Sequence, residues 1–225
     1  MEDIKDESAV AANTEKMNRC KNLGNSLGIL FWLKLAILFM SALMIIITLT
    51  AGITLSLGNS DFFIGSSYVL LVANIVNFVI SISASVIIIT MGKHISDFTL
   101  AGIFYILYAS VDLISKIFIK NNMIISIISS VFSILYTLKF TGGMISAVYP
   151  IDLDLTDGWE KLRKVYISIY GGLAISLIMT KLLSALAIFA AIVALVAAIA
   201  AIVAVIWEVI LIRKSFNEMK AYQGS

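Results

Sequence analysis

One uncharged run near the C-terminus limits what this chain can fold into more than any other feature. The run covers the 26 residues from Leu182 to Trp207, LLSALAIFAAIVALVAAIAAIVAVIW, ten of which are alanine. A helix needs about 20 consecutive apolar residues to cross the hydrocarbon core of a bilayer. Because the run exceeds that length, it predicts a transmembrane helix and places the chain among integral membrane proteins.

Small residues form a regular pattern within this run. Six alanines follow one another at steps of three and four, and the next step reaches Glu208. They are Ala187, Ala190, Ala194, Ala197, Ala201 and Ala204. On a helix this spacing forms one face, where small residues let a neighbouring helix approach closely. We expect this alanine seam to pack inside the protein or between protomers, with Glu208 as an end anchor near Arg213 and Lys214.

The composition of the whole chain agrees with a membrane protein. Of 225 residues, 60% are hydrophobic and 13% charged, and the mean hydropathy is +1.03, which leaves too little polar surface for a soluble domain of this size. A net charge of +2 without a dense basic block argues against a nucleic-acid partner. The single cysteine, Cys20, excludes an intramolecular disulfide. Lysine outnumbers arginine by thirteen to three, which favours a bacterial cell (plasma) membrane as the location.

Polar turns divide the chain into a predicted all-α bundle with six transmembrane spans. The expected spans are 29–57, 62–92, 98–119, 123–142, 162–180 and 183–212, preceded by a cytosolic tail over 1–28 and followed by a short cytosolic tail over 213–225. Span four is expected to end at Gly142-Gly143. The spacing of Asp157 and Glu160 resembles a helix N-cap and its reciprocal partner, so helix five is expected to begin just after Asp157. Trp159 and Tyr166 would then be interfacial anchors.

Length alone separates the last two spans, because no Gly, Pro or Asn marks a turn between them. The residues 165–207 would form a helix of about 64 Å at ~1.5 Å per residue, against about 30 Å of hydrocarbon. We therefore place one break at Thr180-Lys181, with Ser184 as a candidate cap for the last helix.

The distribution of basic residues predicts the orientation. With the N-terminus inside, the cytoplasmic segments hold eleven Lys and Arg residues, and the outer segments hold only Lys120 and Lys181. This bias follows the positive-inside rule and places both termini in the cytoplasm. The eleven are Lys5, Lys16, Arg19, Lys21, Lys93, Lys161, Arg163, Lys164, Arg213, Lys214 and Lys220.

Polar residues recur at helical spacing along the early spans and predict a polar bundle interior. The candidate intramembrane polar or ion site consists of Asp112, Lys116, Tyr105, Tyr108, Asn74 and Asn77. A second candidate is an inner-side charge cluster of Glu208, Lys34 and Lys139. Asp112 and Lys116 are spaced i, i+4 in the favourable acid-first order. Such residues indicate either interhelical hydrogen bonds and structural ion pairs or a wetted proton or ion path.

Catalytic motifs are weak in this chain. The sequence Asp152-Leu-Asp154-Leu-Thr156 spells the D-x-D-x-T of haloacid-dehalogenase-type phosphatases, but fewer than twenty residues of soluble chain surround it, too few for the α/β domain that this chemistry uses. His94 is the only histidine, so no His-pair metal site can form. We therefore expect no enzyme, no cofactor and no metal.

Two classes of function remain. The leading hypothesis is a scaffold or accessory subunit that acts through the bilayer and through a second copy of itself or another membrane protein. The alternative is a small solute, proton or ion transporter or channel that uses Asp112. The sequence favours Asp112 over Glu208 as the functional charge.

Overall fold

The computed structural model describes residues 2–56, 60–118, 122–182 and 187–222, and over these ranges the chain is helical, without strands. The helices are α1 (Glu2–Ser56), α2 (Ser60–Met91), α3 (Ser96–Ile117), α4 (Met123–Val148), α5 (Leu153–Leu182) and α6 (Ala187–Ala221). Five of them, α1 to α4 and α6, are long and apolar enough to cross a membrane. The chain is therefore a multi-pass membrane protein. Helix α5 differs because six of its first twelve residues are charged.

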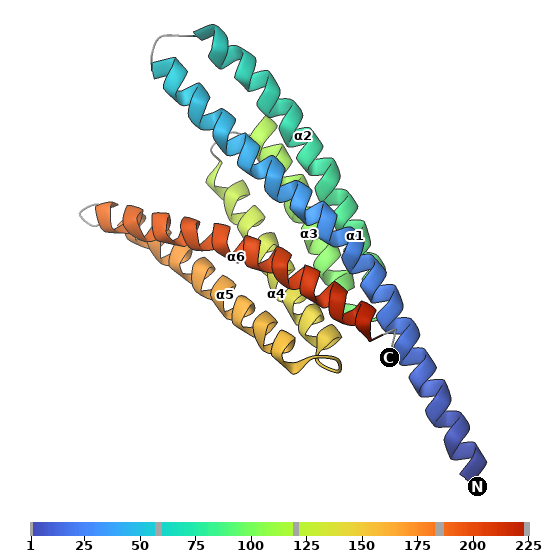
Figure 1. The fold of residues 1–225 in the computed structure, drawn as a ribbon. Helices are drawn as coiled ribbons and strands as arrows, with labels where there is room; N and C mark the ends of the chain where they lie inside the picture. The colour runs from blue at the N-terminus through green and yellow to red at the C-terminus, as the bar shows by residue number, and fades with distance from the viewer. Residues whose placement is uncertain (1, 57–59, 119–121, 183–186, 223–225) are drawn as a thin grey trace.

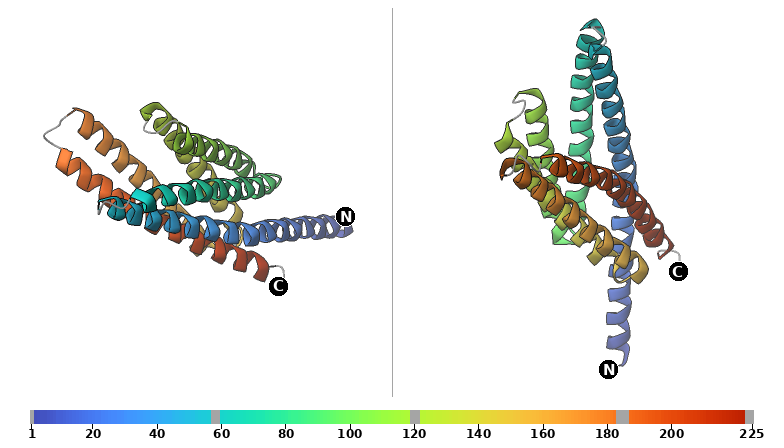
Figure 2. Two further views of the ribbon diagram at one scale, coloured as in Figure 1. Left: turned by 90° about the horizontal axis from the view of Figure 1, so that it is seen from above. Right: turned by 90° about the vertical axis from the view of Figure 1, so that its left-hand side faces the viewer.

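The six helices form a ring. Each helix packs against its neighbours in the sequence, and α6 closes the ring against α1. Figures 1 and 2 show three hairpins, α1–α2, α3–α4 and α5–α6, which converge at the end that holds both termini. At the opposite end the α1–α2 and α5–α6 hairpins point away from each other. The ring is consequently closed at one end and open at the other.

The core occupies the converging end. Trp159, Phe98, Phe140 and Met144 are the centre of a cluster of large, fully buried side chains from all of the helices. Near the hairpin turns the apolar side chains are exposed instead, as at Ile188, which is 79% exposed. Lipid would cover such side chains in a bilayer, because removing apolar surface from water lowers the free energy by about 25 cal/mol per Å². The closed end therefore holds the ring together.

Close backbone contact between α2 and α3 also stabilises this end. A Cβ atom added at Gly102 on α3 would lie 2.4 Å from Ile89 Cγ1 and 2.8 Å from the backbone oxygen of Ser85 on α2. The backbone atom cannot move aside without bending α2. Gly102 thus allows an approach that no other residue permits.

Replacing Gly102 by alanine is expected to lower the free energy of unfolding by about 1–3 kcal/mol, the usual cost of overpacking. Gly172 on α5 is the matched control, since an added Cβ there meets nothing within 4 Å. Gly172→Ala should stabilise its helix by about 0.5–1 kcal/mol. Equilibrium unfolding of both variants in one detergent measures the difference, and equal effects at the two glycines would contradict the proposed contact.

Two helices are longer than the sequence suggests. Helix α1 begins at Glu2 and continues through Gly28, so the segment expected as a cytosolic tail is part of the same helix as the first expected span. Leu23 and Leu27 lie in the core, so the last turns of the expected tail are part of the bundle. Helix α4 likewise continues past Gly142-Gly143, where span four is expected to end, and reaches Val148. Gly143 packs against the ring of Phe98, which makes it a contact residue.

The beginning of α5 corrects the expected cap. The helix starts at Leu153, and the backbone N–H of Leu155 donates to Asp152 Oδ1 at 3.0 Å. Asp157 lies inside the helix, where its carboxylate pairs with Lys161 at 2.6 Å. At the other end α5 continues through Thr180 to Leu182. The candidate cap Ser184 lies outside the described residues, as do Lys120 and the side chain of Lys181.

Candidate functional site

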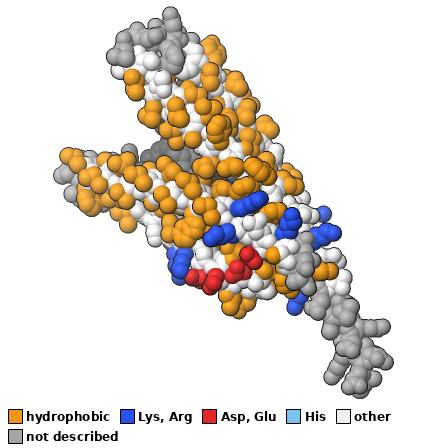
Figure 3. Space-filling view, in the orientation of Figure 1, with side chains coloured by type: hydrophobic (Ala, Val, Ile, Leu, Met, Phe, Trp, Pro, Cys, Tyr) orange, Lys and Arg blue, Asp and Glu red, His pale blue; other side chains and the backbone are white. Residues whose placement is uncertain are grey.

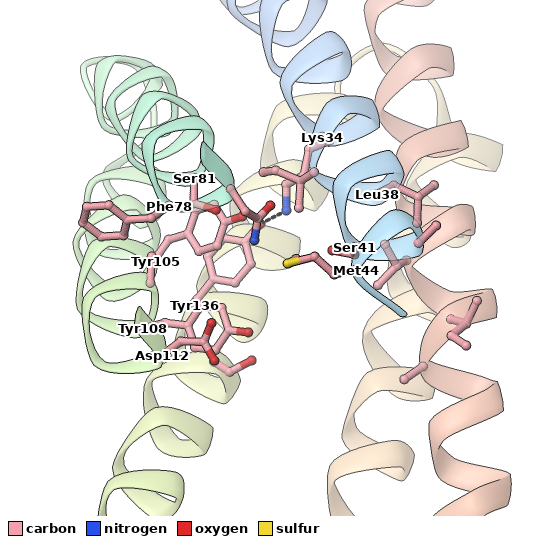
Figure 4. A pocket seen from close by; sticks show the side chains of 18 of the residues that line it. Lys34, Leu38, Ser41, Met44, Phe78, Ser81, Tyr105, Tyr108, Asp112 and Tyr136 are labelled. Atoms are coloured by element: carbon pink, nitrogen blue, oxygen red, sulfur yellow. Dashed lines mark hydrogen bonds between the residues drawn. The ribbon is translucent and has the colours of Figure 1, made fainter. Parts of the chain in front are cut away.

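The polar faces of the helices meet around one cavity of about 620 Å³. All six helices contribute to its lining, and Figure 4 shows Lys34 and Met44 of α1 directed toward Tyr105 of α3 and Tyr136 of α4. The cavity extends from Lys34 and Glu208, near the closed end of the ring, toward Ile46 and Lys116, nearer the hairpin turns. Figure 3 shows the notch that separates the α1–α2 and α5–α6 hairpins beyond it. The cavity thus has a closed end and a side that faces the diverging hairpins.

A buried ion pair forms the closed end. Lys34 Nζ on α1 lies 2.8 Å from Glu208 Oε1 on α6, and the two residues are only 8% and 5% exposed. Tyr166 Oη on α5 donates to Glu208 Oε2 at 2.6 Å, and Lys34 also donates to Tyr136 Oη on α4. These four residues, which we call the floor network, join α1, α4, α5 and α6. Buried ion pairs persist when further hydrogen bonds satisfy both partners, as here.

Aromatic rings surround the ammonium of Lys34. Its Nζ lies 5.0 Å from the ring centroid of Tyr105, 4.8 Å from that of Tyr136 and 5.6 Å from that of Phe140. The negative faces of such rings attract a cation. On its other side, Phe140 contacts Trp159 edge to face at 5.9 Å, so the floor network rests directly on the core. The closed end of the cavity is therefore formed by an ion pair, its hydrogen-bonded tyrosines and the aromatic rings packed below them.

A second ion pair lies higher in the cavity. Lys116 Nζ is 2.7 Å from Asp112 Oδ2 on the same helix, and the two side chains are 42% and 30% exposed. Figure 4 shows the Asp112 carboxylate beside Tyr108. Both partners belong to α3 and neither side chain is fully buried, so this pair ties no second helix to α3. The upper pair is therefore exchangeable, whereas the lower pair is fixed.

The two asparagines of α2 differ in their bonding. Asn74 Nδ2 donates to the backbone oxygen of Leu70 at 2.8 Å. Asn77 Oδ1 is buried and accepts no hydrogen bond from the residues that the structure describes. Buried acceptors are normally satisfied. Asn77 therefore offers an acceptor in the cavity lining.

The structure brings together most of the residues that the sequence singled out. Asp112, Lys116, Tyr105, Tyr108, Asn74 and Asn77 all line the cavity. Of the inner-side cluster, Lys34 and Glu208 pair with each other, but Lys139 lies elsewhere and binds Asp97 Oδ1 at 2.9 Å. Glu208 is not an end anchor near Arg213 and Lys214, because it faces the interior. Arg213 instead lies over the rings of Phe31 and Phe216.

Sequence reasoning missed three tyrosines of the site. Tyr136, Tyr166 and Tyr170 line the cavity, and Tyr166 is buried rather than interfacial. A signal was present, since Tyr136 follows Ser129 and Ser133 at helical steps of four and three. Tyr166 and Tyr170 are also one turn apart on the same helix face.

The alanine seam of α6 faces the bundle from Ala197 to Ala204, and Ala194 is half-buried. Ala197 and Ala204 are buried, and Ala201 lines the cavity. The side chains of Ala187 and Ala190 lie outside the described residues. Because α6 packs against both α1 and α5, the seam's inner half serves packing within the chain.

His94 lies in the connector between α2 and α3 and does not line the cavity. Partial burial lowers the pKa of this imidazole, and the positive charges of Arg19 and Lys93 lower it further. His94 is therefore neutral at pH 7, which leaves the four charges of the lining as the electrostatic features of the site.

Comparison with known proteins gives no further guide to this site. No protein-family model matches the chain, and neither a curated protein nor a solved structure matches it.

Proposed function

We propose that the protein is a small-solute transporter with six spans and both termini in the cytoplasm. The observation that carries the proposal is the convergence of polar side chains from all six helices on one cavity, one end of which is formed by the floor network. Its volume of about 620 Å³ lies within the roughly 300–1,000 Å³ that small-molecule sites occupy. The proposal favours transport over a purely structural role.

Two observations support the topology. Helix α5 packs against both α4 and α6 in the ring, so it crosses the bilayer together with them despite its charged first turns. In Figure 3 the Lys, Arg, Asp and Glu side chains gather near the end that holds both termini, while hydrophobic side chains cover the hairpins. The positive-inside rule then assigns that end to the cytoplasm. The cavity would open to the outside.

Transport requires the floor network to open. Lys34 belongs to the α1–α2 hairpin, whereas Glu208 and Tyr166 belong to the α5–α6 hairpin. Rocking of one hairpin against the rest of the ring would separate these residues and expose the cavity to the cytoplasm, as in transporters that work by alternating access. The floor network is thus the proposed inner gate.

Access to the cavity from each membrane face tests this proposal. Ser133→Cys in a Cys20→Ser background places the only thiol in the lining. A transporter should react with a membrane-impermeant maleimide in right-side-out and in inside-out vesicles. Ser130→Cys is the matched control, since Ser130 is one turn away, exposed and absent from the lining. A thiol in hydrocarbon should not react from either side.

Reaction of Ser133→Cys from one face only would overturn the transport proposal, because the cavity would then never change sides. That result would favour a scaffold or accessory subunit with a ligand pocket. Reaction at Ser130→Cys would show that the assay does not separate lining from lipid-facing positions, and the comparison is valid only when this control stays unmodified.

A further inference from the structure

We infer that the cavity binds organic cations with an apolar body, whose positive charge is held by Asp112 beside the ring of Tyr108. The inference rests on the proposed function for its physiological meaning, because it names the class of solute transported. The binding itself can be measured without transport.

The two ion pairs differ in what they leave available to a ligand. Both oxygens of the Glu208 carboxylate are engaged, by Lys34 and by Tyr166, and this pair is buried. A ligand that displaced either partner would leave a buried charge uncompensated. Asp112 pairs with Lys116, whose long side chain is 42% exposed. A ligand cation can therefore take the place of the Lys116 ammonium beside Asp112 while the long lysine side chain turns aside.

The aromatic walls favour the same charge sign. Tyr105 stacks on Tyr136 with 4.5 Å between ring centroids, and Tyr108 continues the stack at 6.1 Å from Tyr105. The lower rings already hold a cation, the Lys34 ammonium. The upper ring, Tyr108, lies next to Asp112. Ring faces attract cations and repel anions through the quadrupole of the π system.

An anionic ligand fits this lining poorly. It would have to recruit Lys116 and leave Asp112 nearby as a repelling charge, or recruit Lys34 and release Glu208 inside the protein. The first arrangement places like charges close together, and the second leaves a buried carboxylate without its partner. The lining of the cavity therefore favours a cationic ligand over an anionic one.

Apolar side chains also line the cavity and would contact the body of the ligand. They include Leu38, Met44 and Ile45 of α1 and Phe78 of α2. Figure 4 shows Met44 directed across the cavity toward the tyrosine wall. Methionine adapts to ligands of different shape, because its side chain is unbranched and flexible. The lining thus accepts a bulky apolar cation rather than a small hydrated one.

Two probes of the same shape and opposite charge test the inference. Tetraphenylphosphonium and tetraphenylborate are titrated into the purified full-length protein in detergent, and partitioning into protein-free micelles is subtracted. We expect the phosphonium to bind with an affinity at least about tenfold higher than that of the borate, a difference of ~1.4 kcal/mol. Equal binding of the two probes, or tighter binding of the borate, would overturn the inference.

Substitutions of the exchangeable pair give opposite expectations. Asp112→Asn should weaken phosphonium binding about tenfold or more, whereas Lys116→Met should strengthen it, because the competing ammonium is gone. The matched controls are Asp97→Asn and Lys139→Met, which remove the same groups from the ion pair outside the cavity. Both controls should bind as the unaltered protein does. Unchanged affinity in a folded Asp112→Asn variant would overturn the inference.

The results separate the inference from the proposed function. Phosphonium binding that depends on Asp112, together with labelling of Ser133→Cys from one face only, would support the cation site and overturn transport. Labelling from both faces without phosphonium binding would support transport and overturn the cation site.

Discussion

Glu208→Gln is expected to lower the free energy of unfolding by about 3–5 kcal/mol, the cost of leaving one partner of a buried ion pair uncompensated. The ammonium of Lys34 would remain in a site where it is only 8% exposed. The aromatic rings around it contribute about 2 kcal/mol or more, but they carry no net charge and cannot replace the carboxylate. Equilibrium unfolding in mixed micelles measures the loss.

A double variant distinguishes the charge effect from a loss of packing. Lys34→Met combined with Glu208→Gln removes both charges and keeps similar volumes, so it should recover most of the stability that the single variant loses. Asp112→Asn is the control for an exposed pair and should cost less than about 1 kcal/mol. If Glu208→Gln unfolds like the unaltered protein, the pair does not form in the membrane as described.

The sequence predicts both partners of the upper ion pair, whereas for the lower one it predicts only an inner-side cluster of Lys34, Lys139 and Glu208 without showing which of these residues pair. Asp112 and Lys116 lie one turn apart on one helix, so helical geometry alone brings them together. Lys34 and Glu208 meet only because α6 closes the ring against α1. No local pattern encodes that closure. For the same reason Glu208 was assigned to the neighbouring basic residues Arg213 and Lys214, which lie close to it in sequence.

The ends of α4 and α5 show that tertiary contacts can outweigh a local sequence signal for where a helix begins or ends. Asp152 and Asp157 are both of a residue type that suits an N-cap, and the sequence predicts Asp157 because Glu160 follows it three residues later. The structure uses Asp152, which starts α5 early enough to bury Leu155 and Trp159 on one helix face. Glycine has a low helix propensity and so predicts a helix end. Gly143 nevertheless lies within α4, because the ring of Phe98 occupies the space that a side chain would fill.

The N-terminal segment holds a helical spacing of leucines that its polar composition obscures. Leu23, Leu27 and Leu30 are spaced by four and three residues, which is the pattern of a helix face that packs on a core. All three are buried. The surrounding charged and polar residues are typical of a cytosolic tail, so composition outweighed the periodicity. Composition therefore predicts whether a segment lies in the membrane or in water better than it predicts whether the segment is helical.

Trp159 provides the second large expected effect. The sequence placed it at the membrane interface, but its side chain is fully buried beneath the floor network. Its indole Nε1 donates to Ser215 Oγ on α6 at 3.1 Å, so the ring links α4, α5 and α6. Trp159→Ala should lower the free energy of unfolding by about 3–5 kcal/mol, because the cavity that it leaves cannot collapse in a packed core.

Trp32 offers the same substitution on the outside of α1, since its side chain is 64% exposed. Trp32→Ala should change stability by no more than about 0.5 kcal/mol, as is usual for exposed positions. Trp159→Phe and Ser215→Ala separate the indole hydrogen bond, about 0.5–1.5 kcal/mol, from the packing of the ring. Because Trp159 supports Phe140 and so the ring cage of Lys34, Trp159→Ala should also expose the floor network. Faster cytoplasmic-side labelling of Ser133→Cys in that background would reveal the opening, and an unchanged rate would show that the floor network closes the cavity without support from the core.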